Sequence, residues 1–388
     1  MLQSKPDKSG YEYQRTGRYF IQVAGSLERL ARAELLDLGA NIHTEVPRGF
    51  FVSCNLETLY RIIYTSRLCQ RVLAPLVSFA CHSEKYLARQ SASLLDWTSL
   101  FEVDSSFGID VNLSGSKIKH SLYAGQLVKD AICDQFRAQS GRRPDFRTTN
   151  PDINFNLHIK DNYATLAMDL SGSMHKRGYR SGPSDAPLQE TLAASIVKLS
   201  GWDGRNPLSD PMCGSGTLLC EALMSWCRIP AAILRENKYI ERFPDHDPKL
   251  WKELRAQANQ AMRELPDGLI SGSDVSATAL AVARASLDRL PYGRGVKLVK
   301  SRFQELPSQA GRCVITNPPY GVRLEESASV AKIYNDLGDW LKQRCPSSEA
   351  YILCGSADLA SQLRLRAWWK KSLKNGDLEV KLAKILIR

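Results

Sequence analysis

The sequence NPPYG, at residues 317–321, puts an amide and an aromatic ring beside two prolines, directly after an apolar, strand-like run. Proline has no backbone N–H to donate, so the strand must end here, and the chain becomes stiff and extended. The Asn317 side-chain oxygen and the Pro318 carbonyl can together accept two hydrogen bonds from an exocyclic amine, and Tyr320 can stack on the base that carries it. Because such binding aims the nitrogen lone pair at an electrophile, the stretch predicts catalysis mainly by orientation. The alternative is a plain proline turn.

A glycine-rich turn, DPMCGSGT at residues 210–217, lies upstream between a short strand and a helix. Gly214 and Gly216 allow the backbone to approach a ligand closely, and the start of the helix offers free amides. The spacing is too short for a phosphate-binding P-loop, and the lysine of that motif is missing. A ligand with a carboxylate and a ribose therefore fits better than a nucleoside triphosphate. An ordinary Gly-Ser turn is the alternative.

Asp274 ends a second apolar strand, in the sequence ISGSDVS. A carboxylate at this place in a nucleotide-binding sheet accepts hydrogen bonds from the hydroxyls of a ribose. The usual gap between the glycine turn and this acid is about 20 residues. Residues 228–268, mostly charged and helical in pattern, must therefore be an insertion after the first helix. The alternative is an aspartate that caps the next helix.

The second half of the chain predicts the sheet that must position these residues. After a helix from about residue 187 to residue 201, strands and helices alternate, which predicts a parallel sheet with helices on both faces. Asn375-Gly376 between the last two strand-like runs predicts an antiparallel hairpin at the end. We expect an α/β, Rossmann-like domain over residues 171–388.

The front half shows no catalytic cluster, and it predicts α+β binding modules. We expect a flexible polar tail over residues 1–17 and a ferredoxin-like β-α-β-α unit over residues 18–68. Residues 69–170 should form a second α+β unit that ends in a hairpin. In that hairpin, Asn154, Asn156 and His158 alternate with apolar residues, which predicts one hydrated and one buried face.

The chain is basic, with 52 Lys and Arg against 41 Asp and Glu, a formal net charge of +11 and a pI near 9.1. This balance favours a polyanionic partner over an acidic small substrate, and a solvated basic surface is the alternative. Residues 364–388 concentrate positive charge around Trp368 and Trp369, which are stacking surfaces for nucleic acid or anchors on the core. Residues 137–147 hold a second group of cations, which includes Arg142, Arg143 and Arg147.

The ten cysteines form no Cys-x-x-Cys pair, which argues against a zinc ribbon and for reduced thiols in a cytoplasm. Cys213, Cys220 and Cys227 recur every seven residues, but no histidine joins them, so buried thiols on a helix face are the better interpretation. No run approaches the roughly 18 apolar residues of a membrane span, and the start has no apolar signal region. We expect a cytoplasmic protein with no metal and no membrane partner.

Taken together, these motifs resemble those of the class I S-adenosylmethionine-dependent RNA methyltransferases with a THUMP domain, most closely the large-subunit ribosomal RNA guanine-N2 methyltransferases. The resemblance covers nearly the whole chain, and its most specific feature is HKRGYR (175–180) followed by APLQETLAA (186–194). It implies that residues 69–170 are a THUMP RNA-binding domain. It also implies that residues 171–388 are a class I methyltransferase domain with a parallel sheet and a C-terminal antiparallel hairpin.

The resemblance implies S-adenosyl-L-methionine as the cofactor and large-subunit ribosomal RNA as the partner, and it leaves the oligomeric state open. The residues that it assigns to the cofactor are Thr191, Asp210, Cys213, Gly214, Ser215, Gly216, Asp274, Phe303 and Asn317. The residues that it assigns to the target guanine are Asn317, Pro318, Pro319 and Tyr320. We expect the RNA to contact Arg142, Arg143, Arg147, Lys176 and Arg177.

Two positions depart from the family pattern. Ser276 stands where the family often has a second acid. The family often has a further acid that contacts the adenine amine, but the stretch KSRFQEL (300–306) shows none that we assign to this role; Phe303 could instead stack on the adenine and a backbone amide could read its edge. Some relatives carry a second methyltransferase domain, and because this chain ends at residue 388 we expect one reaction.

The expected reaction is methyl transfer to the N2 amine of a guanosine in 23S ribosomal RNA. The same chemistry on tRNA is the nearest alternative, and adenine-N6 methylation of DNA is less favoured because the front module is of RNA-binding type. An RNA-binding protein with an inactive catalytic domain is a third alternative, against which the intact Asn317, Asp274 and glycine turn argue.

Overall fold

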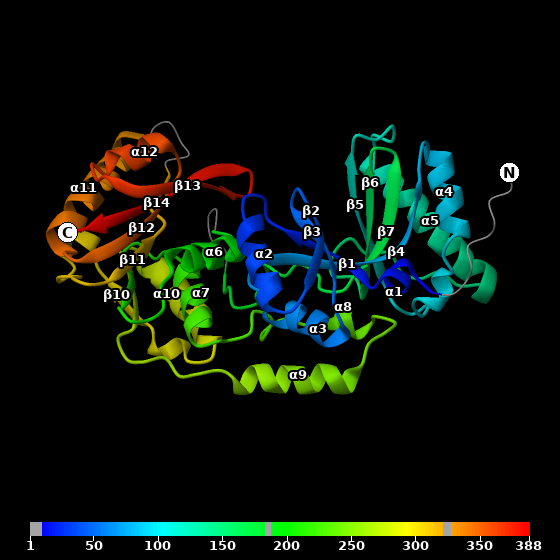
Figure 1. Cartoon of the computed structure of the whole chain (residues 1–388), viewed down its shortest axis with the longest axis horizontal. Coiled ribbons are helices and arrows are strands. Elements are labelled where there is room, and N and C mark those ends of the chain that lie inside the picture. Colours follow the sequence, from blue (N-terminus) through cyan, green and yellow to red (C-terminus); the bar gives the residue numbers. More distant parts are fainter. Residues whose placement is uncertain (1–9, 183–187, 321–326) are drawn as a thin grey trace.

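The computed structural model describes residues 10–182, 188–320 and 327–388, and its strands form two seven-stranded sheets that lie side by side along the long axis (Figure 1). The sheet of the front half has the order β2-β3-β1-β4-β7-β6-β5. Its strands are β1 (Arg18–Val23), β2 (Asn41–Val46), β3 (Gly49–Ser53), β4 (Cys69–Ala80), β5 (Phe107–Ser114), β6 (Ile153–Lys160) and β7 (Tyr163–Asp169). Its helices are α1 (Glu12–Thr16), α2 (Glu28–Asp37), α3 (Leu56–Thr65), α4 (Glu84–Ser93), the 3-10 turn η1 (Trp97–Ser99) and α5 (Ser121–Ser140).

Strand β4 joins the two front modules into one sheet. It pairs antiparallel with β1 on one side and with β7 on the other, over most of its twelve residues. The ferredoxin-like unit and the module after it were expected as separate units. Because one long strand serves both, their relative position is set by backbone hydrogen bonds rather than by a linker.

Residues 10–17 are not a flexible tail, so this part of the prediction was wrong. Tyr11 precedes the short helix α1, and Tyr13 within it is fully buried. The Tyr13 ring lies 5.0 Å from the ring of Phe243 in the second half of the chain. The error has a simple cause: a polar segment is ordered here by one aromatic side chain whose partner lies far away in the sequence. Residues 1–9 lie outside the described residues.

The predicted hydrated face of strand β6 is exposed only at its far end, at His158 and Lys160. Asn154 and Asn156 are both buried, whereas His158 is exposed. The Asn154 amide donates a hydrogen bond to Asp110 of the neighbouring strand at 2.8 Å. The alternation along the strand was therefore right, but its polar face is covered by other parts of the protein.

The sheet of the second half has the order β10-β9-β8-β11-β12-β14-β13, in which the first five strands are parallel and β14 is antiparallel to both of its neighbours. Its strands are β8 (Leu208–Asp210), β9 (Ile270–Asp274), β10 (Lys297–Lys300), β11 (Cys313–Thr316), β12 (Ser348–Cys354), β13 (Ala367–Asn375) and β14 (Leu378–Ile387). Its helices are α6 (Glu190–Ser200), α7 (Thr217–Trp226), α10 (Ala277–Asp288), α11 (Ser327–Arg344) and α12 (Ala357–Gln362), with the 3-10 turns η2 (Gly293–Gly295) and η3 (Phe303–Glu305).

This sheet confirms the predicted α/β fold with a terminal antiparallel hairpin. Apolar residues of α6 and α7, such as Leu192 and Leu219, form one core with Leu353 and Leu382 of the sheet. A second core lies on the opposite face, where Tyr334 of α11 belongs to it. Helices therefore cover both faces, and the carboxyl ends of the parallel strands are left free to carry the site.

The predicted insertion lies between α7 and β9, and it reaches across to the front half. It contains α8 (Lys238–Glu241) and α9 (Pro248–Gln260), and α9 runs alongside α3 (Figure 1). Trp251 of α9 packs edge-on against Tyr60 at 5.1 Å and against Tyr64 at 5.7 Å. The insertion is therefore a brace between the two halves.

All ten cysteines are free thiols, and nine of them are buried, Cys213, Cys220 and Cys227 included. The described residues contain no group of three or more His, Cys, Asp or Glu side chains arranged to hold a metal ion. Among the described helices, none is both long enough and apolar enough to span a membrane.

Candidate active site

The glycine turn, residues 210–217, runs from the end of β8 into α7, with its two glycines in the left-handed region. Gly214 has a φ of 52° and Gly216 a φ of 79°. A Cβ atom on Gly214 would meet no described atom within 4 Å, so this part of the turn faces open space. A Cβ atom on Gly216 would lie 3.0 Å from the Cβ of Ala283, so this glycine lets α7 pack against α10. Cys213 is buried beside Gly214, and the Ser215 residue between the glycines is partly exposed.

Asp274 at the end of β9 holds the glycine turn in place. Its Oδ2 accepts a hydrogen bond from the Gly214 backbone N–H at 2.9 Å. Its Oδ1 accepts one from the Ser276 N–H at 2.9 Å, while the Ser276 hydroxyl caps α10. The cap is therefore the serine, and the aspartate joins the ends of two neighbouring parallel strands. The turn and the acid meet although 60 residues separate Gly214 from Asp274.

Asp210 connects the glycine turn to the third strand of the site, β11. Its buried carboxylate accepts hydrogen bonds from the Thr316 hydroxyl at 2.7 Å and from the Met212 N–H at 3.2 Å. Burial raises the pKa of Asp210 to about 7, although these two hydrogen bonds oppose the rise, and the charge of Asp274 adds to it. Asp210 is enclosed, so its place is behind the turn rather than in contact with a ligand.

Asn317 and Tyr320 interact directly after β11 ends at Thr316. The Tyr320 hydroxyl donates a hydrogen bond to the side-chain oxygen of Asn317. The Tyr320 ring lies against Gly355, where an added Cβ would come within 2.7 Å of the Tyr320 Cβ. Burial raises the pKa of the Tyr320 hydroxyl, so it remains a donor. Pro318 is buried and Pro319 exposed. Gly321 lies outside the described residues.

Thr191 and Phe303 are more enclosed than the sequence suggested. Thr191 of α6 is fully buried, and its hydroxyl has no hydrogen-bond partner among the described residues. Phe303 is buried against Trp340, with ring centroids 5.8 Å apart, which leaves little of its surface for a ligand.

Sequence reasoning missed Val275, which is 61% exposed immediately after Asp274. An exposed apolar side chain next to Asp274 offers more surface for contact with a flat base than the buried Phe303 does. The available signal was an apolar residue in an otherwise polar turn.

The arginine cluster predicted to contact RNA is exposed on the front half. Arg142, Arg143 and Arg147 all lie on the surface after the end of α5. Arg142 pairs with Asp104, and Arg147 pairs with Asp145 at 3.6 Å. Such exposed pairs are weak, so both cations stay available to a polyanion.

The prediction that Arg177 contacts RNA was wrong, because Arg177 is buried. Its Nε donates to the Glu221 carboxylate at 3.4 Å and its Nη1 to the Met174 carbonyl at 2.6 Å. A buried guanidinium needs such partners, and these come from α7 and from the linker, the residues between β7 and α6 (170–182 as described). Its neighbour Lys176 points the other way and lines a cavity.

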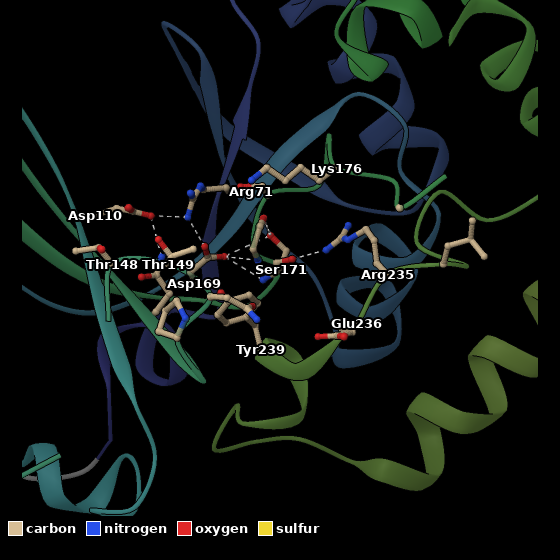
Figure 2. Close-up of a pocket in the computed structure, with 17 residues that line it drawn as sticks. Arg71, Asp110, Thr148, Thr149, Asp169, Ser171, Lys176, Arg235, Glu236 and Tyr239 are labelled. Atoms are coloured by element: carbon tan, nitrogen blue, oxygen red, sulfur yellow. Dashed lines mark hydrogen bonds and ion pairs between the residues drawn. The ribbon is translucent and has the colours of Figure 1, made fainter. Parts of the chain in front are cut away.

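That cavity, of about 610 Å³, lies where the front sheet, the linker and the insertion meet (Figure 2). Arg71 of β4 bridges Asp169 and Asp110, the second at 2.8 Å. Arg235 of the insertion donates to the Ser171 carbonyl from the other side (Figure 2). The linker between the two halves is therefore held by a polar network.

Three family models match the chain in order. An RlmL ferredoxin-like domain matches residues 18–73, a THUMP domain matches residues 89–169, and an RMKL-like methyltransferase domain matches residues 177–384.

Several known proteins are similar over nearly the whole chain. A protein of Synechocystis sp. named "Putative RNA methyltransferase slr0064" is 33% identical, over 98% of this chain and 99% of its own length. The ribosomal RNA large subunit methyltransferase K/L of Methylococcus capsulatus is 35% identical, over 95% of this chain and 51% of its own length. The chain thus spans about half the length of the K/L relatives that it matches.

Solved structures agree with this pattern. SMU.472, described as "a putative methyltransferase complexed with SAH", is 26% identical, with a TM-score of 0.82 over 96% of this chain and 98% of its own. The methyltransferase model covers more than half of the chain, and the front-half models and the full-length Synechocystis relative complete the match. The chain therefore belongs to the RMKL-like methyltransferase family, with an RlmL ferredoxin-like domain and a THUMP domain in front of the catalytic domain.

Proposed function

We propose that the protein transfers a methyl group from S-adenosylmethionine to the exocyclic N2 amine of a guanosine in 23S ribosomal RNA. The observation that carries this proposal is the convergence of Asn317, Asp274 and the glycine turn at one edge of the parallel sheet, through the Thr316 and Asp210 hydrogen bond. The names of the K/L relatives, the THUMP match and the SAH bound to SMU.472 support the choice of substrate and cofactor.

The residues around the glycine turn fit S-adenosylmethionine, which supplies an electrophilic methyl group when bound. The open space in front of Gly214 would take the backbone-like methionine part. The Asp274 carboxylate would accept hydrogen bonds from the ribose hydroxyls, and the exposed Val275 would contact the base. The Thr191 hydroxyl, which has no hydrogen-bond partner among the described residues, is a further polar group for the ligand on the helix that precedes the turn.

Asn317 and Pro318 would orient the target amine. A carbonyl oxygen has two lone pairs, so the Asn317 oxygen can accept from the amine while it still accepts from Tyr320. The Pro318 carbonyl would accept the second N–H, and the Tyr320 ring would lie beside the base. Catalysis then needs orientation rather than a general base, because the amine attacks while neutral and afterwards loses its proton to water or to the Asn317 and Pro318 oxygens.

The division of labour along the chain is part of the proposal. Residues 69–170 would bind RNA without chemistry, through Arg142, Arg143 and Arg147, and Lys176 would contact it from the linker. Residues 171–388 would carry the reaction, and residues 18–68 would support the RNA-binding module through β4.

Mass spectrometry of nucleosides from a deletion strain tests the proposal. The expected result is loss of one N2-methylguanosine from a single fragment of 23S ribosomal RNA, restored by the intact gene and not by an Asn317→Ala variant. Loss of the same nucleoside from tRNA would instead support the tRNA alternative. Loss of N6-methyladenine from DNA would contradict the choice of both base and nucleic acid.

A further inference from the structure

We infer that the outer face of β13 is a second RNA-contact surface, which leads a single strand of the substrate to the catalytic edge of the sheet. The inference rests on the proposed function in taking RNA as the substrate, and it adds a site to that function. Alternate residues of this part of the chain lie on one face, and all of them are exposed. We call this row the hairpin face: Arg366, Trp368, Lys370, Ser372 and Lys374.

Trp368 separates the two interpretations that the sequence left open. Its side chain is 72% exposed, whereas its neighbour Trp369 packs against Tyr351 with ring centroids 6.2 Å apart. Trp369 is thus an anchor on the core, and Trp368 is not. The large, flat ring of Trp368 is exposed to solvent, and a nucleobase can stack on such a ring.

The positive charge beside Trp368 is poorly compensated. Among the residues that the structure describes, none forms an ion pair with Arg366, Lys370 or Lys374. Glu379 is in register with Lys374 and pairs with Lys381 at 2.8 Å. The hydrogen bond and charge of Lys381, and further the charge of Lys374, lower the pKa of Glu379, so this one acid is shared between two cations. Cations gathered along one strand repel one another, and a phosphate backbone relieves this repulsion.

The front half places a cation against the opposite side of β13. Lys371, which points to the opposite side of β13, has its pKa lowered by burial and by the charge of Arg29 on α2. Helix α2 belongs to the ferredoxin-like unit, and Figure 1 shows the hairpin of β13 and β14 extending toward it. Arg29 thus brings a cation of the front half next to the hairpin, on the side of β13 that faces away from the hairpin face.

The hairpin projects past the catalytic edge of the sheet. Strand β12 ends at Cys354, which pairs with Lys381 of β14, so the residues from 373 to 380 continue beyond that edge. The next residue, Gly355, contacts the Tyr320 ring. Arg366 precedes β13, and the pairing with β14 shifts register between Ala367 and Trp369. The regular part of the hairpin face, from Lys370 to Lys374, is about 14 Å long at about 3.4 Å per residue. The hairpin face therefore runs along the outermost strand to the level of the catalytic edge, with β14 and β12 between it and β11.

A ring and cations at alternate positions fit an extended single strand, whose bases stack and whose phosphates pair without regard to sequence. The test measures binding of a single-stranded RNA of about 15 nucleotides, and of protein-free 23S ribosomal RNA, by fluorescence anisotropy at several salt concentrations. We compare Trp368→Ala, Trp368→Phe and the pair Lys370→Glu with Lys374→Glu. The matched control is Lys249→Glu with Lys252→Glu, which makes the same charge change on exposed positions of α9.

Trp368→Ala should weaken binding of the single strand about 5- to 150-fold, and Trp368→Phe should retain most of it. The lysine pair should reduce the salt dependence by about 1.4 in the slope of log affinity against log salt, at about 0.7 for each phosphate contact. Cofactor affinity by calorimetry should stay unchanged in each variant, which shows that the fold is intact.

Equal binding by Trp368→Ala and the wild type, or an equal loss in the α9 control, would overturn the inference. A hairpin face that serves a protein or a lipid would give the first of these results. The two proposals fail separately: a wild type that methylates 23S ribosomal RNA with unaffected hairpin variants removes only the hairpin face. A wild type that methylates no ribosomal RNA, with weakened RNA binding in the variants, removes only the proposed function.

Discussion

Asn317 is the residue on which the proposed chemistry depends. Asn317→Ala removes the oxygen that would hold the target amine, and it leaves the glycine turn and Asp274 untouched. We expect unchanged cofactor affinity and a turnover about 10²- to 10³-fold lower, the scale for loss of one group that acts in the transition state. Single-turnover assays with labelled cofactor and 23S ribosomal RNA measure this. A wild-type rate in the variant would return NPPYG to a plain proline turn.

The Tyr320 hydroxyl should matter more than the sequence alone suggested. From the ring and its stacking role, Tyr320→Phe is expected to be mild, but the structure shows the hydroxyl donating to Asn317. Loss of one hydrogen bond of about 0.5–1.5 kcal/mol should lower turnover about 2- to 13-fold while RNA affinity stays the same. Tyr292→Phe, at a partly exposed tyrosine, is the control. A larger fall in RNA affinity than in turnover would contradict a positioning role.

Asp210 should make the stability of the fold depend on pH. Its folded-state pKa of about 7 lies above the usual 3.8, so between these values the folded state holds more protons than the unfolded one. The stabilisation is complete below the unfolded pKa, and it is lost as the pH rises through about 7. The difference amounts to at most about 4 kcal/mol.

Urea unfolding from pH 4 to 8 checks this, with Asp210→Asn as the comparison, because asparagine keeps an oxygen for Thr316. The free energy of unfolding of the wild type should fall relative to that of the variant as the pH rises. Parallel curves for the two proteins would mean that the carboxyl group does not titrate in this range.

At the scale of single elements, the brace formed by α9 is the clearest target. Trp251 is buried against Tyr60 and Tyr64, and the Tyr64 hydroxyl donates to Asn259 of the same helix at 2.9 Å. Trp251→Ala should cost about 3–5 kcal/mol of the packing between α3 and α9. Because the site lies elsewhere, we expect normal cofactor affinity, faster proteolysis of the insertion and a higher KM for ribosomal RNA.

Lys252→Ala, at the exposed neighbouring position, should change none of these quantities. If Trp251→Ala instead lowered cofactor affinity and left the KM for RNA unchanged, the insertion would support the catalytic domain rather than the placement of the front half.

At the scale of the whole molecule, the exposed arginines of the front half should supply affinity without chemistry. Arg142→Glu with Arg143→Glu should weaken binding of ribosomal RNA and reduce its salt dependence, since each lost phosphate contact changes the slope by about 0.7–0.9. The maximal single-turnover rate at saturating RNA should stay unchanged. Titrations from low to high salt give the slope. A slope equal to that of the wild type would place the RNA elsewhere.

From the sequence alone, local chemistry was sufficient to predict that the site residues lie at one edge of the sheet. A proline pair must end a strand, glycines must occupy the left-handed turn, and Asn375-Gly376 must close a hairpin, whatever surrounds them. The alternation of strands and helices then implies a parallel sheet, in which all carboxyl ends share one edge. Asn317, Asp274 and the glycine turn could therefore be brought together in advance.

Burial was decided only by the tertiary structure, because it depends on partners far away in the sequence. Lys176 and Arg177 are adjacent cations, yet one lines a cavity and the other is buried against Glu221. The polar segment around Tyr13 forms an ordered helix because the Tyr13 ring packs against Phe243, far away in the sequence. No local pattern contains these contacts, since they exist only after the insertion and the front sheet have met.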